Sequence, residues 1–164
     1  MSKWHLYFFL LPFILLNSSF YAPLPECGPI PDLNKKVVAF VKTQISKKVG
    51  RGECWDLASE ALNTVGATWD HQFSFGKELK KSEECIFPGD IIQFEGVELN
   101  YRRGNRIFHE DLAHHTAIIY EVNSKGNYVL AQQNTDSHGR KVGLDPFEIQ
   151  SVSKGIVKIF RPMN

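Results

Sequence analysis

Hydrophobic residues between positions 32 and 65 recur every three or four positions, which is the spacing of amphipathic α-helices. One set predicts a helix from about Asp32 to Val49, with lysines on the opposite side and Gly50 as its stop signal. A second set predicts a helix from Cys54 to Val65, ended by Gly66. The residues between them, Gly50-Arg51-Gly52-Glu53, have the composition of a turn.

Beyond position 88 the pattern changes to short β-rich runs separated by turn residues. The predicted strands are Asp90–Phe94, His115–Val122, Tyr128–Gln132 and Gly155–Phe160. Residues 101–106 form a predicted hairpin tip, and residues 124–127 form a predicted turn. Because helices come first and antiparallel strands follow, we expect an α+β fold with the N-terminal helices packed on one face of an antiparallel β-sheet.

The N-terminal residues have the pattern of a secretory signal peptide. Lys3 precedes an apolar run that ends at Leu16, and small and polar residues follow. The run is shorter than the ~20 residues that a bilayer span needs. We therefore predict a signal peptide at 1–22, a Pro-rich segment at 23–31 and one domain at 32–164. The mature chain would then be exported, periplasmic or secreted, with no membrane span.

Charge gives little indication of a partner, because the net charge of the 164 residues is only +1. Basic residues cluster between Lys35 and Arg51 and again between Arg102 and Arg106. Such clusters are most often solvated surfaces. We see no nucleic-acid-binding motif and expect no nucleic-acid partner.

The chain has three cysteines, and an odd number in an exported protein favours one disulfide and one free thiol. Cys54 lies in a position suited to chemistry, directly after a glycine turn and in the first turn of a predicted helix. Counting therefore predicts a disulfide between Cys27 and Cys85.

Cys54 is the candidate nucleophile. A helix N-terminus favours a thiolate through its partial positive charge and its free N–H groups. The same N–H groups can bind the oxyanion of a tetrahedral intermediate. Gly52 leaves room for a substrate backbone, and we expect Gly52, Trp55 and His114 to contact the substrate.

His115 is the candidate base, because it begins a predicted strand that would hold its imidazole rigidly. His114 and His115 alternate faces, so only one of them can point at Cys54. A third group must orient the imidazole, and the next strand offers Gln132 and Asn134 on one face. Pairing through the turn at 124–127 would bring Asn134 within a residue or two of the position opposite His115.

Four sequence blocks in this order resemble the NlpC/P60 superfamily, and particularly its CHAP branch. They are Gly52–Ala58, Pro88–Phe94, His115–Tyr120 and Leu130–Asn134. The resemblance implies a papain-like α+β core, and a cysteine peptidase or amidase that cleaves peptidoglycan peptides without a cofactor.

By this resemblance Cys54 is the nucleophile, His115 the general base and Asn134 an orienting group. Gln132 stands where CHAP-type members often carry a glutamate. Without that carboxylate an imidazolium has less electrostatic support. Trp55 also replaces the small residue that usually follows the cysteine.

Two alternatives remain open from the sequence. The first is a catalytically weak module that binds cell-wall or protein ligands on the same fold, and Gln132 is its best support. The second is a zinc site formed by Cys54, His114, His115 and His109, but no spaced pair of metal ligands supports it. We therefore expect no metal.

Overall fold

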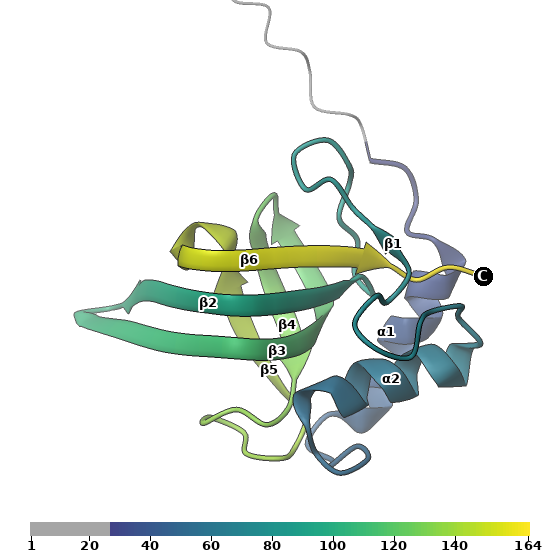
Figure 1. The fold of residues 1–164 in the computed structure, drawn as a ribbon, viewed down its shortest axis with the longest axis horizontal. Helices are drawn as coiled ribbons and strands as arrows, with labels where there is room; N and C mark the ends of the chain where they lie inside the picture. Colours follow the sequence, from purple (N-terminus) through teal and green to yellow (C-terminus); the bar gives the residue numbers. More distant parts are fainter. Residues whose placement is uncertain (1–26) are drawn as a thin grey trace, which may run out of the picture.

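Two α-helices precede a six-stranded sheet in the computed structural model, which describes residues 27–164 (Figure 1). The predicted signal peptide lies outside the described residues. Within residues 27–164, no helix has the length and apolar character needed to cross a membrane. A disulfide joins Cys27, which precedes the first helix, to Cys85, which precedes the long strands of the sheet.

The first helix, α1, spans Asp32–Gln44 and is shorter than the sequence pattern predicts. The chain leaves the helix because Ser46 has a φ of 65°, in the left-handed region. Ile45 instead forms a bridge with Val142, and the Ser46 N–H donates to the Val142 carbonyl at 2.8 Å. The apolar periodicity continues beyond α1 because Val49 is also buried in the core.

The second helix, α2, spans Cys54–Val65, as predicted. Its start is fixed by a capping box, in which the side chains of Glu53 and Asp56 each accept a hydrogen bond from the other residue's backbone N–H. Gly66 ends the helix in the left-handed conformation, with a φ of 73°. Local caps therefore place Cys54 in the first turn.

The sheet has the order β1-β6-β2-β3-β4-β5, and every pair of neighbours is antiparallel. Both helices precede all of its strands in the chain, so the predicted α+β class is confirmed. The short 3₁₀ helix η1, Ile149–Ser151, links the last two strands. The strands are β1 Lys77–Glu78, β2 Ile91–Arg103, β3 Arg106–Ser124, β4 Asn127–Gln132, β5 Gly143–Glu148 and β6 Val152–Arg161.

Strands β2 and β3 are much longer than the sequence predicts and extend as an arm away from the helices (Figure 1). They remain paired as far as Arg103 and Arg106, with Gly104 in the turn at a φ of 60°. Strand β5 was not predicted, because Pro146 interrupts the strand pattern. Proline is tolerated there because β5 is an edge strand, paired only with β4.

The two faces of the sheet bury different sets of residues. One face packs against the helices and includes Ile118. The other face carries a second apolar cluster that includes Phe94 and Ala117. Side chains alternate along β3, so His115 lies on the same face as Ala117, and its ring contacts that of Phe94 at 6.0 Å between centroids. The candidate base is thus placed on the face of the sheet away from the helices.

Candidate functional site

The N-terminus of α2 holds Cys54 in a partly exposed position, and Cys54 is the free thiol among the three cysteines. Asp56 braces this end of the helix, because its carboxylate accepts hydrogen bonds from the N–H groups of Arg51 and Glu53 and from the Arg51 guanidinium. Burial opposes ionisation of Asp56, but these donors lower its pKa below the ordinary value. The helix start is therefore well fixed, and its first N–H groups face outward from the helix.

His115 is buried and hydrogen-bonded through Nε2 to Gln132 Oε1, at 2.9 Å. The Gln132 amide cannot turn freely, because its Nε2 donates to Asp145 Oδ2 at 2.9 Å. Since the Gln132 oxygen can only accept, His115 must carry its proton on Nε2. The Nδ1 lone pair is then left to act as a base.

Burial lowers the pKa of His115 below its ordinary value, because the buried imidazole loses the hydration that favours its charged form. The hydrogen bond to Gln132 and the charge of Glu110 oppose this decrease, while His114 adds to it. The net result is an imidazole that is neutral at pH 7. A neutral imidazole can accept a proton but cannot by itself stabilise a thiolate as an ion pair.

Two consecutive residues after Gln132 connect the His115 strand with the start of α2. The buried Gln133 amide bonds to the Val49 N–H and carbonyl and to the Glu53 carbonyl, at 2.8 to 3.2 Å. Asn134 Nδ2 donates to Glu53 Oε2 at 2.9 Å. The residue before Cys54 is therefore tied to the strand end that orients His115.

Asn134 does not occupy the position that the strand register suggested. Strand β4 ends at Gln132, and Asn134 has a φ of 60°, which turns its side chain toward Glu53. The structure gives the contact with His115 to Gln132 instead. The catalytic roles of Cys54, His115, Gln132 and Asn134 stay predictions.

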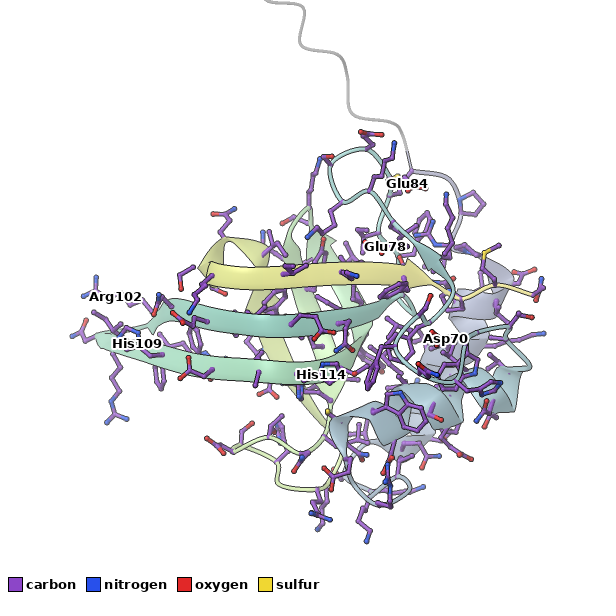
Figure 2. The ribbon with its side chains drawn as sticks, viewed as in Figure 1. Asp70, Glu78, Glu84, Arg102, His109 and His114 are labelled. Carbon is purple, nitrogen blue, oxygen red and sulfur yellow. A yellow bond between two sulfur atoms is a disulfide. The ribbon has the colours of Figure 1, made fainter. Side chains whose placement is uncertain are left out.

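The three predicted substrate contacts differ in their surroundings. Gly52 is buried with a φ of 87°, and a Cβ there would lie 2.8 Å from the Arg140 Cβ, so the space beside it is filled. Trp55 is half-buried and donates from Nε1 to the Gln72 carbonyl at 2.5 Å. His114 is exposed, pairs with Glu95 at 2.7 Å and lies on β3 (Figure 2).

A groove of about 1060 Å³ opens from His115 along the sheet. His115, Gln132 and Asn134 are among its lining residues, and so are Tyr101 and Phe108 of the arm. These two aromatic rings stack at 5.2 Å between centroids, and the Arg103 guanidinium lies 5.0 Å from the Tyr101 ring centre. Figure 2 shows Arg102 and His109 at the far end of the same arm.

Asp145, a neighbour of the site on the unpredicted strand β5, was missed by sequence reasoning. It lies 13 residues beyond Gln132 and outside all four family-like blocks. A strand containing Pro146 gives no alternating signal, so only the observed pairing of Gln132 with Gly143 brings Asp145 close. A carboxylate, that of Asp145, is therefore present near His115, but it bonds to Gln132 and not to His115 itself.

Metal binding finds no support in the part of the chain that the structure describes. No group of three or more histidine, cysteine, aspartate or glutamate side chains is arranged there to hold an ion. His109 instead bonds to Asn100 on the arm, and His114 bonds to Glu95.

Two solved structures resemble this chain in part. They are the crystal structure of Ly7917 and that of Ly7917 with the hydrolyzing product of MDP, with TM-scores of 0.45 and 0.46. Both are 17% identical in sequence, and the alignments cover 77% and 79% of this chain and 62% of each of theirs. At these scores the likeness carries no argument about function.

A curated relative comes from Debaryomyces hansenii and is named "Altered inheritance of mitochondria protein 3". It is 26% identical over 171 residues, covering 87% of this chain. The alignment covers 18% of that protein, so this chain spans about a fifth of the length of the curated relative.

The model of one family, the AIM3/BBC1 cysteine proteinase-fold domain, matches residues 32–164. This match overturns the predicted periplasmic or secreted location, because the relative is a yeast protein named for mitochondrial inheritance and not an exported bacterial enzyme. That location was inferred from the N-terminal pattern alone, a charged start followed by an apolar run and small and polar residues. The match agrees with the expected papain-like cysteine proteinase fold. The chain belongs to the AIM3/BBC1 cysteine proteinase-fold domain family.

Proposed function

We propose that this domain binds an extended segment of a partner protein in the groove beside His115, with little or no hydrolytic turnover at Cys54. The observation that carries the proposal is the hydrogen bond from buried His115 to the neutral amide of Gln132, two residues that line a large groove. It combines a surface suited to binding with a base that lacks direct support from a carboxylate.

The groove has the chemical character of a peptide-binding surface. Its lining is mixed, with apolar residues such as Leu99 and Leu130 beside polar ones such as Asn100 and Gln150. Tyr101 presents a large ring and donates its hydroxyl to Glu110. Burial, together with this contact, raises the pKa of Tyr101 to about 12, so its hydroxyl stays protonated. Rigid aromatic residues with satisfied polar ends are typical anchors of protein interfaces.

The low turnover follows from electrostatics. A thiol hydrolase works best when an imidazolium stabilises the thiolate and then protonates the leaving amine. Here burial lowers the pKa of His115, and the adjacent oxygen belongs to an amide without net charge. The carboxylate of Asp145 contacts His115 indirectly, through Gln132. A pair of Cys54 thiolate and His115 imidazolium would therefore be only weakly stabilised.

Selection of binding peptides from a phage-displayed library of unstructured segments tests the proposal. For the selected peptide, fluorescence anisotropy should show about a ten-fold weaker Kd for Tyr101→Ala, which removes an aromatic anchor. Cys54→Ala should bind as the wild type does. The control is Ile156→Ala, which removes an exposed apolar residue of β6 that does not line the groove. Equal affinities for wild type and Tyr101→Ala would refute the groove as the binding surface.

A second candidate is a cysteine peptidase or amidase, favoured by the placement of Cys54 in the first turn of α2. In this mechanism Cys54 attacks an amide carbonyl after His115 Nδ1 takes its proton, and His115 then protonates the leaving amine. Water hydrolyses the resulting thioester, which regenerates the thiol. Peptidoglycan peptides are the substrate that the NlpC/P60 and CHAP resemblance would add.

Turnover assays separate the two candidates. Fluorogenic peptide amides and purified peptidoglycan would be incubated with wild type and with Cys54→Ala. The binding proposal expects wild type to release little or no product, close to the level seen with Cys54→Ala. Rapid, repeated release of product by wild type alone would instead establish the hydrolase.

A further inference from the structure

We infer that His138 is a positioning residue for His115, acting through Asp145 and Gln132. This inference rests on the proposed site, because it concerns how that site holds its imidazole. Three contacts form the chain: His138 Nε2 to Asp145 Oδ2 at 3.0 Å, Gln132 Nε2 to Asp145 Oδ2 at 2.9 Å, and His115 Nε2 to Gln132 Oε1 at 2.9 Å. One carboxylate and one amide therefore link the two histidines.

The His138 ring is held in this place by the backbone around it. The backbone N–H of His138 donates to Thr135 Oγ1 at 3.2 Å, and the Thr135 and Gly139 backbones bond to each other. These bonds hold the loop that carries the ring. Gly143 of β5 lies directly beneath the ring, and a Cβ added there would lie 2.0 Å from the His138 Cδ2. The ring occupies the space that any side chain at position 143 would need.

The contact between His138 and Asp145 is close but is not aligned as a hydrogen bond. His138 Nε2 is buried and makes no aligned hydrogen bond in the described structure, although Asp145 Oδ2 lies within ion-pair distance. Ser137 Oγ approaches the other carboxylate oxygen at 3.5 Å. A buried polar nitrogen costs free energy unless a partner compensates it, so the ring favours the Asp145 rotamer that faces both His138 and Gln132.

That rotamer decides which way the Gln132 amide points. With Asp145 in place, the Gln132 nitrogen faces the carboxylate and its oxygen faces His115. If Asp145 turned away, the amide could reverse and present its nitrogen to His115. His115 would then carry its proton on Nδ1, and the nitrogen expected to act as the base would be blocked.

Nitrogen-15 NMR of the histidine side chains measures the two tautomers of His115 directly. In wild type the Nε2–H form should dominate. In His138→Phe, which keeps a ring but removes its nitrogens, the ratio of Nε2–H to Nδ1–H should fall roughly five-fold, as expected for the loss of one modest polar contact. The control, His109→Phe, removes a histidine of the groove that bonds to Asn100 and not to Asp145, and should leave the ratio unchanged.

An unchanged ratio in His138→Phe would overturn the inference, as would an equal fall in the control. If His138→Phe does not fold, Gly143→Ala provides the same test, because it displaces the His138 ring without changing any ionisable group. The ratio of Nε2–H to Nδ1–H in His115 should fall in this variant too. The measurement needs neither peptide binding nor turnover. Failure of the proposed function would therefore leave this result intact, and failure here would leave peptide binding untouched.

Discussion

Two clusters of buried polar side chains, one around Asp90 and one around His115, use similar groups to different effect. Asp90 is fully buried and bonds directly to the Arg161 guanidinium at 2.7 and 3.0 Å, with Asn34 and the Phe87 N–H as further donors. His115 meets a neutral amide, and the carboxylate of Asp145 stands behind it. The Asp90 cluster joins α1, the loop before β2 and β6 through one ion pair with Arg161 and neutral donors from Asn34 and Phe87. The hydrogen bonds from Asp145 through Gln132 fix the orientation of the His115 ring but place no charge directly beside it.

Removing the cation from the Asp90 cluster should cause the largest loss in the free energy of unfolding. Arg161→Ala leaves the Asp90 carboxylate buried without its cation, which typically costs about 3 kcal/mol or more. Chemical denaturation should show this loss in the free energy of unfolding. Lys154→Ala is the control, because it breaks an exposed pair with Glu98 and should leave the free energy of unfolding almost unchanged. Equal losses in the two variants would show that the buried cluster does not stabilise the fold.

Breaking the link between the end of β4 and the start of α2 should cause the second largest loss of stability. Gln133→Ala removes the partner of three backbone groups at Val49 and Glu53, and we expect a loss of about 2 kcal/mol. Amide hydrogen exchange at residues 49–53 should become faster. The exposed Gln150→Ala serves as the control. Unchanged exchange in Gln133→Ala would argue against this link.

Exchanging the amide and the carboxylate would make the His115 cluster resemble the Asp90 cluster. The double variant Gln132→Glu with Asp145→Asn keeps the total charge but places a carboxylate against His115. It should raise the pKa of His115 and accelerate alkylation of Cys54 near pH 6 by about ten-fold, the effect of one charge next to an imidazole. Asp145→Asn alone is the control. An alkylation rate equal to that of wild type would contradict the electrostatic explanation.

The smallest effect concerns pH. Because burial lowers the pKa of His115 in the folded state, the unfolded chain binds a proton at a higher pH than the folded chain. The contribution of His115 to stability is therefore complete above its unfolded pKa and decreases as the pH falls toward its folded pKa. Between pH 7.5 and 5.5, denaturation of wild type should show a loss of less than about 1 kcal/mol from this residue. His115→Phe should lack that part of the loss, whereas His109→Phe should retain it.

The sequence predicted the parts of the fold that depend on local signals. The bounds of α2 follow from a glycine turn before Cys54 and Gly66 after Val65, both of which act within a few residues. The early end of α1 depends on Val142, almost a hundred positions away, and could not be read from periodicity. The same holds for the length of the arm, because strand pairing and not local propensity extends β2 and β3 to Arg103 and Arg106.

The site was predictable to a similar degree. Cys54 and His115 could be singled out because a helix start and a strand start are local features. Gln132 and Asn134 could be placed on one face by alternation, but the left-handed turn at Asn134 gave the contact with His115 to Gln132. Asp145 depends on the pairing of β4 with β5, which leaves no pattern in either strand alone.

The charge state of His115 at pH 7 is the most direct test of weak catalysis at this site. Nitrogen-15 NMR would follow the His115 imidazole in wild type and in Cys54→Ala across a pH titration. A neutral ring with its proton on Nε2 is expected at pH 7 in both proteins, because no thiolate–imidazolium pair holds a second proton. An imidazolium at pH 7 in wild type that becomes neutral in Cys54→Ala would contradict this account and establish an active cysteine–histidine pair.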